Sequence, residues 1–450
     1  MNATRFPDIV RTERGARAMG HSRLDTFVAP RPNRLLIKAM SPVNRLVMLG
    51  GMPGLRDVPL LDRLPVIRGL ADIRKFEFPP ADRARLAAVC NGKYVTFITP
   101  NHPEFFTDWM IDKHLAATFC PMVASWATNG VVNGLGRLAQ RFWLGNNLIA
   151  QIPGNSEPAR DHSVAWAMTG QGVLLHPEGS VGWHGDWVAP LMPGAAEMAR
   201  EALDLGGAGR KVWIAPVVWK LAFMRDVEPG LAAECAYVER KLAISPPSGG
   251  ANPAERVYGI YGALLARDER AAGLSVSADS YGDRQERLLV VLRQRLSKRL
   301  PEHRPSDETE LLRAARRFLR ESRAVAPRQI RAEIRSAIEA IQRVRRVGPF
   351  AWADRAMTQE RVAEHLKRIR NDYCKGTLRD TMNRYIPRPV GPRRAHLRVP
   401  EPLALHDFTG SAHEAMAEIR SRMQDALDGI NIVLKASGSL RTYPNPFYDR

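Results

Sequence analysis

A histidine followed by two carboxylates stands directly after a short apolar segment, in a pattern that suits general-base chemistry. Segment 94–100 contains strand-forming side chains and no charge, so we expect a buried strand that ends at its final proline. His102 follows in a turn, with Glu104 and Asp108 shortly after it. A carboxylate that holds one imidazole nitrogen leaves the other free to accept a proton. His102 is therefore a candidate general base; the alternative is that it only caps the turn.

A second turn of the same kind follows later in the chain. Segment 173–175 is expected to be a strand, and it stops at the run His-Pro-Glu-Gly-Ser over residues 176–180. Parallel α/β sheets bind their ligands outside the carboxyl ends of their strands. Because both turns follow strands, we expect them to lie at that edge of one sheet.

These turns lie in a region where expected strands and helices alternate. Buried strands are predicted at 94–100, 146–153, 173–175 and 212–219. The alternation predicts an α/β fold with a central, mostly parallel sheet flanked by helices. We place this core at residues 85–225, after an N-terminal arm and lip at residues 1–84.

Four short blocks occur in a fixed order within this core. The first is an asparagine–histidine pair with a later aspartate (Asn101, His102 and Asp108), and the second is a Pro-Glu-Gly-Ser block (residues 177–180). The third is a Gly-Ala-Ala helix start (residues 193–196), and the fourth is a strand that contains a proline (residues 214–218). In identity, order and spacing they resemble the motifs of the glycerolipid acyltransferase family, of the lysophosphatidic acid type with a PlsC-like domain. One such block is weak evidence, whereas four in order are specific.

The resemblance implies an O-acyltransferase that moves a fatty acyl chain from a thioester, acyl-CoA or acyl carrier protein, to a hydroxyl of a lysophospholipid or glycerol-phosphate-type acceptor. His102, oriented by Asp108, would remove the hydroxyl proton as the oxygen attacks the thioester. Backbone amides near Gly179 would stabilise the oxyanion. No acyl-enzyme, bound cofactor or metal is implied. The substrate-binding roles fall to Asn101, Glu178, Gly179 and Ser180.

Two departures from the family pattern bear on this site. Five residues instead of four separate His102 from Asp108, so Thr107 stands at the family's aspartate position. Either a one-residue bulge in the turn restores Asp108, which we favour, or Glu104 takes its place. The family's arginine after the Pro-Glu-Gly-Ser block is replaced by Val181. We therefore expect either another cation for an acceptor phosphate or an acceptor without a phosphate there.

Composition limits the classes of protein that the chain can be. Its 450 residues are 45% hydrophobic, enough for a packed core, and no apolar run is long enough to span a bilayer. The net charge of +19 favours anionic partners, but no nucleic-acid-binding module accompanies it. Four scattered cysteines and no apolar leader indicate a reducing compartment. We expect a cytoplasmic protein associated peripherally with an anionic membrane surface, and no nucleic acid partner.

The chain changes character after residue 225. Residues 226–395 are expected to form an arginine-rich helical insertion, before a strand and helix at 396–435 that close the core and a tail at 436–450. One helix carries an apolar face made by Ile330, Ile334, Ile338 and Ile341, and its arginines lie off this face. This helix belongs either to a solvated bundle or to a surface for phospholipid head groups or an acidic partner.

Two other functions fit the sequence less directly. The extra residue before Asp108 and the loss of the arginine at Val181 are compatible with a catalytically degenerate family member that serves as a lipid-binding scaffold. The basic helices favour a non-enzymatic binder of anionic membrane or nucleic acid. Acyl transfer that disappears in a His102→Ala variant separates the enzyme from both alternatives.

Overall fold

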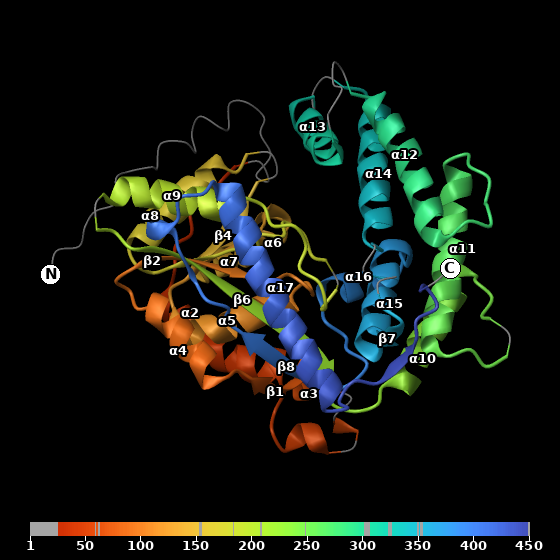
Figure 1. Cartoon of the computed structure of the whole chain (residues 1–450), viewed down its shortest axis with the longest axis horizontal. Coiled ribbons are helices and arrows are strands. Elements are labelled where there is room, and N and C mark those ends of the chain that lie inside the picture. The colour runs from red at the N-terminus through yellow and green to blue at the C-terminus, as the bar shows by residue number, and fades with distance from the viewer. Residues whose placement is uncertain are drawn as a thin grey trace.

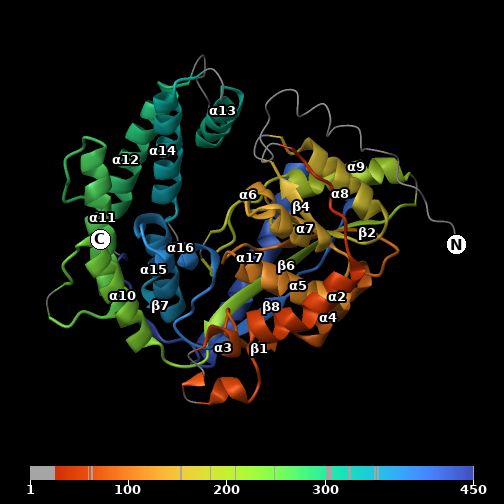
Figure 2. The same cartoon turned by 180° about the vertical axis from the view of Figure 1, so that it is seen from behind.

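The molecule has an α/β lobe and a helical lobe beside it (Figures 1 and 2). This computed structural model describes residues 26–448 except 59, 62–63, 153–154, 183, 208, 248, 301–306, 323–325, 349–350 and 352–353. Each lobe has a hydrophobic core of its own. Among the described residues, no helix is both long enough and apolar enough to cross a membrane.

One sheet in the order β1-β8-β6-β2-β5-β3-β4 forms the α/β lobe, with β9 paired to β6. Strands β2 to β6 run parallel, whereas β8 is antiparallel to β6 and parallel to β1. The predicted α/β class with a mostly parallel sheet is confirmed. The strands are β1 (Ile73–Glu77), β2 (Val95–Pro100), β3 (Ala124–Thr128), β4 (Leu148–Gln151), β5 (Val173–Leu174), β6 (Val212–Phe223), β8 (Arg393–Arg398) and β9 (Leu403–Ala404).

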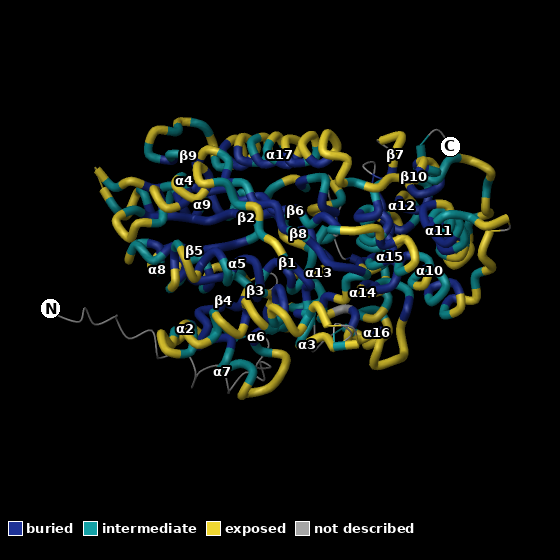
Figure 3. Tube along the Cα trace, turned by 90° about the horizontal axis from the view of Figure 1, so that it is seen from below, coloured by how far each residue is buried: buried dark blue, intermediate teal, exposed yellow. Residues whose placement is uncertain are grey.

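Helices cover both faces of this sheet, which is why its central strands are apolar on both sides. In β2, Phe97 packs with residues of α9 and α17, whereas its neighbour Ile98 packs with residues of α4 and α5. Figure 3 shows α17 along one side of the buried strands and α2, α6 and α7 on the opposite side. The helices of the lobe are α2 (Arg34–Val43), α3 (Pro65–Arg68), α4 (Pro80–Val89), α5 (Thr107–Phe119), α6 (Asn129–Asn133), α7 (Arg137–Gly145), α8 (Glu157–Met168), α9 (Gly194–Gly206) and α17 (Ala412–Ala436).

The sheet begins earlier in the chain than predicted. Strand β1 pairs with β8 at the sheet edge, so the segment before residue 85, expected as an arm and lip, contributes one strand to the sheet. The sequence hides β1 because only Ile73 of its five residues is buried, which leaves no apolar run to recognise. The closing strand and helix are present as β8 and α17, close to the expected residues 396–435.

The tail belongs to the helical lobe. Its strand β10 (Thr442–Pro444) pairs antiparallel with β7 (Ala356–Thr358), and Phe447 is buried in the core of that lobe. Residues 436–450, expected to be a tail, thus contribute β10 to this lobe. The helices of the lobe are α10 (Glu228–Leu242), α11 (Pro253–Ala271), α12 (Tyr281–Ser297), α13 (Glu308–Glu321), α14 (Arg328–Arg345), α15 (Gln359–Tyr373) and α16 (Leu378–Tyr385).

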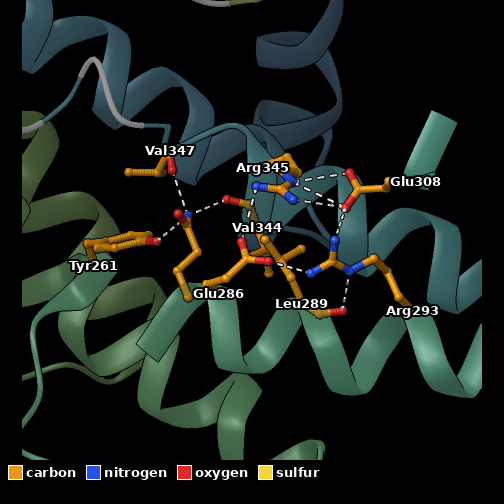
Figure 4. A network of polar contacts seen from close by, with 9 residues as sticks. Tyr261, Glu286, Leu289, Arg293, Glu308, Val344, Arg345 and Val347 are labelled. Carbon is orange, nitrogen blue, oxygen red and sulfur yellow. Dashed lines mark hydrogen bonds and ion pairs between the residues drawn. The ribbon is translucent and has the colours of Figure 1, made fainter. Parts of the chain in front are cut away.

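Some arginines of the helical lobe form ion pairs with carboxylates of the same lobe. The isoleucine face predicted for α14 is confirmed, since Ile334, Ile338 and Ile341 are buried. Off that face, Arg345 of α14 pairs with Glu308 of α13 at 3.1 Å, as Figure 4 shows. This pair joins α13 and α14, so the positive charge of Arg345 is partly neutralised inside the lobe. The solvated-bundle interpretation therefore describes this part of α14 better than a free surface for phospholipid.

Candidate active site

Asn101 fixes the turn that carries the candidate base. Pro100 ends β2, and the amide of Asn101 then donates to the carbonyl oxygen of Val217 at 3.1 Å. The Asn101 side chain bonds both backbone groups of Trp219, with Nδ2 donating to the oxygen and Oδ1 accepting from the nitrogen, each at 3.0 Å. The side chain thus continues the β2–β6 pairing beyond the proline. Asn101 positions His102, and its side chain has no direct place in the cavity described below.

The carboxylate that reaches His102 is Asp108. Oδ2 of Asp108 lies 2.6 Å from Nδ1 of His102, and its Oδ1 accepts the backbone N–H of Trp109. Phe106, which directly precedes α5, has a φ of +68°, an unusual conformation for a residue other than glycine. Glu104, the alternative carboxylate, instead pairs with Arg393 of β8 at 2.5 Å.

A second imidazole–carboxylate pair stands beside the first. The rings of His176 and His102 stack with centroids 4.2 Å apart at 21°. Nε2 of His176 lies 3.0 Å from Oδ2 of Asp112. Sequence reasoning placed His176 at a strand end but assigned no role to it or to Asp112. The available signal was the spacing of Asp108 and Asp112, which lie one helical turn apart on α5 and so share a face.

The two histidines differ in protonation. Burial and the neighbouring His176 lower the pKa of His102, so this ring is neutral near pH 7. Burial opposes the charged form of His176 as well, but Asp112 outweighs it and raises the pKa of His176 to about 9. Burial raises the pKa of Asp112, whereas the interactions with His102 outweigh burial at Asp108 and lower its pKa. The site therefore combines a neutral imidazole with a charged one.

Glu178 supports the turn instead of facing a substrate. Its Oε1 accepts the backbone N–H of His102 at 2.7 Å, and its Oε2 accepts that of Ala189 at 3.0 Å. Burial raises the pKa of Glu178 to about 7. Neither Glu178 nor Ser180 lines the cavity in front of His102. The expected substrate-binding role of these two side chains therefore has no direct geometric support.

Gly179 lines the cavity in a conformation that favours glycine. Its φ is +73°, and a Cβ atom built there would lie 2.5 Å from Sδ of Met192. Its backbone N–H donates to the carbonyl oxygen of His176 at 3.3 Å within the turn. Because the turn already uses this amide, a developing oxyanion would need a neighbouring amide.

His102, Asp108 and His176 open onto a cavity of about 320 Å³ with largely apolar walls. The apolar side chains that line it include Phe105, Phe106, Trp109, Trp126, Val131, Trp143, Leu148, Leu175 and Met192. Two cations also line it: Arg160 of α8, which pairs with Glu197 at 3.1 Å, and Arg313 of α13. The cavity thus receives side chains from both lobes. Such walls suit an amphipathic ligand with an apolar chain and an anionic group.

One group of potential metal ligands occurs in the part of the chain that the structure describes. His102, Asp108 and His176 each place one ligand atom within 4.8 Å of the others. However, Nδ1 of His102 faces Asp108, and both nitrogens of His176 face acceptors, Asp112 and the carbonyl oxygen of Asn101. A metal-binding histidine needs a nitrogen lone pair directed at the ion. Both nitrogens of His176 are engaged by hydrogen-bond acceptors and Nδ1 of His102 lies against Asp108, so we assign no metal to the group.

The contact between Asp108 and Nδ1 of His102 leaves Nε2 as the nitrogen available to a molecule in the cavity. A neutral imidazole held in this way can remove a proton from a hydroxyl group. No family model matches the chain, and no curated protein matches it in sequence. A functional proposal therefore depends on this geometry and on the sequence motifs that build it.

Proposed function

We propose that the protein is an O-acyltransferase of the glycerolipid acyltransferase type, which moves a fatty acyl chain from a thioester to a hydroxyl of a lysophospholipid-type acceptor. The observation that carries the proposal is the neutral His102, held by Asp108 at 2.6 Å and facing a largely apolar cavity. The order of the four sequence blocks supports the same conclusion.

In the proposed reaction the acceptor oxygen attacks the carbonyl carbon of the thioester. Nε2 of His102 takes the hydroxyl proton as the new C–O bond forms, and Asp108 stabilises the resulting imidazolium. The tetrahedral intermediate then collapses, the C–S bond breaks, and the thiolate leaves with the electron pair of that bond. His102 returns the proton, which yields the free thiol and the ester. The donor is a coenzyme A or acyl-carrier-protein thioester, and no acyl-enzyme, cofactor or metal takes part.

The walls of the cavity fit the two substrates of this reaction. Aromatic side chains surround the space in front of His102 and can pack against acyl chains. Arg313 and Arg160 lie on the same cavity, whereas Val181 replaces the family's arginine, so these two cations are our candidates for an acceptor phosphate. The acceptor we favour is therefore an anionic lysolipid.

Access to such a lipid suggests that the protein works at a membrane surface, as a peripheral cytoplasmic protein. Leu135 and Leu138, at the junction of α6 and α7, are 66% and 81% exposed. Val131 of α6 and Trp143 of α7, on either side of this pair in the chain, line the cavity. An exposed apolar pair beside the cavity is suited to contact with acyl chains, and the positive net charge favours an anionic bilayer.

The test is release of free thiol from palmitoyl-CoA by the purified protein with a panel of lysophospholipids. We expect acceptor-dependent release that is lost in His102→Ala and retained in His162→Ala, which alters a histidine of α8 outside the cavity. Product analysis by mass spectrometry identifies the acylated hydroxyl. If His102→Ala keeps the activity, the assignment of the base is wrong. If neither acyl-CoA nor acyl-carrier-protein thioesters are consumed, the lipid-binding scaffold becomes the better interpretation.

A further inference from the structure

The second histidine of the site, His176, directs both ring nitrogens at hydrogen-bond acceptors. Its Nδ1 lies 3.0 Å from the carbonyl oxygen of Asn101, and its Nε2 lies 3.0 Å from Oδ2 of Asp112. A backbone carbonyl can only accept, and the same holds for the carboxylate of Asp112 in its ionised form, so with Asp112 ionised each nitrogen of His176 carries a proton. An imidazole protonated on both nitrogens is a cation. This geometry agrees with the pKa of about 9 that Asp112 produces at His176 in spite of burial.

This cation is stacked on the candidate base. The rings of His176 and His102 lie 4.2 Å apart and are nearly parallel. At such a distance a positive charge opposes a second positive charge on His102 more strongly than it would in water, because both rings are largely removed from solvent. Since both of its nitrogens are engaged, His176 has none left to exchange a proton with a molecule in the cavity.

We propose that His176 is a positioning residue whose fixed positive charge keeps the stacked imidazole of His102 neutral and ready to accept a proton below neutral pH. Asp112 holds His176 in its charged form, so the pair acts as a unit built into α5 and the segment after β5. The effect on catalysis rests on the proposed function. The effect on the protonation of His102 does not, because it concerns the protein without substrate.

Other charged groups around the two rings modify the influence of His176 on the protonation of His102 without replacing it. Asp108 favours the protonated form of His102, as Asp112 does from further away, and so both oppose His176. Glu178 adds a carboxyl group behind the turn. Among the described residues, further charged groups near the site include Lys113 beside Asp112, Arg420 near Glu178, and Arg160, Glu197 and Arg313 on the cavity.

The direct test is an NMR titration of the histidine rings between pH 5 and 9, in EDTA to remove stray metal ions. His102 and His176 are assigned by the loss of their signals in substituted proteins. The wild-type protein should show His176 still protonated at pH 8 and His102 neutral at pH 7. In His176→Phe, which keeps an aromatic ring without the charge, the midpoint of His102 should move to higher pH. An unchanged or lower midpoint would overturn the proposal, as would a His176 that loses its proton at or below pH 6.5.

Two further variants separate charge from structure. His176→Phe leaves Asp112 without its partner, so the double variant with Asp112→Asn removes the whole pair and should still raise the midpoint of His102. His176→Gln keeps a donor for Asp112 and serves if the phenylalanine variant does not fold. A midpoint that stays at the wild-type value in all folded variants would show that stacking, not charge, is the role of His176.

Catalysis provides a second measurement. If the protein transfers acyl groups, the acid limb of kcat/KM should move to higher pH in His176→Phe. Activity at a fixed pH below the limb should then fall about tenfold for every pH unit that the limb moves. A proportional loss at every pH would point to a purely structural role and overturn the catalytic consequence. If no acyl transfer is found, the proposed function fails, while the titration still decides whether His176 controls the charge of His102.

Discussion

The contrast between two neighbouring carboxylates gives the sharpest prediction. Asp108 lies 2.6 Å from Nδ1 of His102, whereas Glu104 lies 2.5 Å from Nη1 of Arg393. Glu104 lies in the turn after β2 and Asp108 in the first turn of α5, and the sequence allowed either to orient the base. The structure predicts that neutral amides at these positions have opposite consequences: Asp108→Asn should impair turnover, and Glu104→Gln should impair stability.

The expected size of each effect follows from the contacts. Asp108→Asn removes a buried charge that holds the ring and stabilises its imidazolium, so kcat should fall by about 10² to 10⁴. Glu104→Gln leaves Arg393 largely buried with its bonds to the carbonyl oxygen of Ala71 and without its ionic partner. This should lower the free energy of unfolding by roughly 2 kcal/mol and change kcat by less than about threefold.

The assays are thiol release from acyl-CoA with the best acceptor and unfolding in urea followed by circular dichroism. Both variants are measured in both assays, so each one serves as the control for the other. Two results would refute the reasoning: a kcat of Asp108→Asn close to that of the wild type, or a loss of kcat in Glu104→Gln as large as that in Asp108→Asn. The second result would mean that Glu104 orients the base in solution.

Two further predictions test the positioning of the turn and the contact with lipid. Asn101→Ala removes both hydrogen bonds to a buried neighbouring strand and should lower the free energy of unfolding by about 2 kcal/mol, measured by urea denaturation; an unchanged midpoint would contradict the bracing role. Serine at both Leu135 and Leu138 should reduce sedimentation with anionic liposomes, whereas serine at Ile432 and Val433, an exposed pair on α17, should not. Equal loss in both variants would exclude a local lipid contact.

The sequence predicted the central strands well and the marginal ones poorly. Segments 94–100 and 212–219 are uncharged and largely apolar because both faces of β2 and β6 are covered, and such a run is visible without a structure. Strand β3 was missed because its sequence, Ala-Ser-Trp-Ala-Thr, is small and partly polar. Strand β1 was missed because it lies at the sheet edge with only Ile73 fully buried. The hydrophobic pattern of a sequence reveals a strand only where its side chains are apolar and buried, and β1 and β3 have few such side chains.

The candidate site divides in the same way. The motifs paired His102 with Asp108, and the structure places the two in contact, because both lie in the short segment between the end of β2 and the first turn of α5. The motifs assigned substrate contacts to Asn101 and Glu178, but the structure has both bonded to backbone groups. A sequence block marks that a residue matters for a site without saying whether it faces the ligand or holds the backbone.

The sequence by itself determined the fold class and the two turns that carry imidazoles and carboxylates to one edge of the sheet, since strand patterns and turn residues are local properties. Only the tertiary structure decided which partners those side chains have. Arg393 pairs with Glu104, which lies 289 positions away in the chain, and Asp112 pairs with His176, which lies 64 positions away. Such pairings depend on how the sheet and the helices pack, and the sequence around a charged residue does not indicate which distant group will neutralise it.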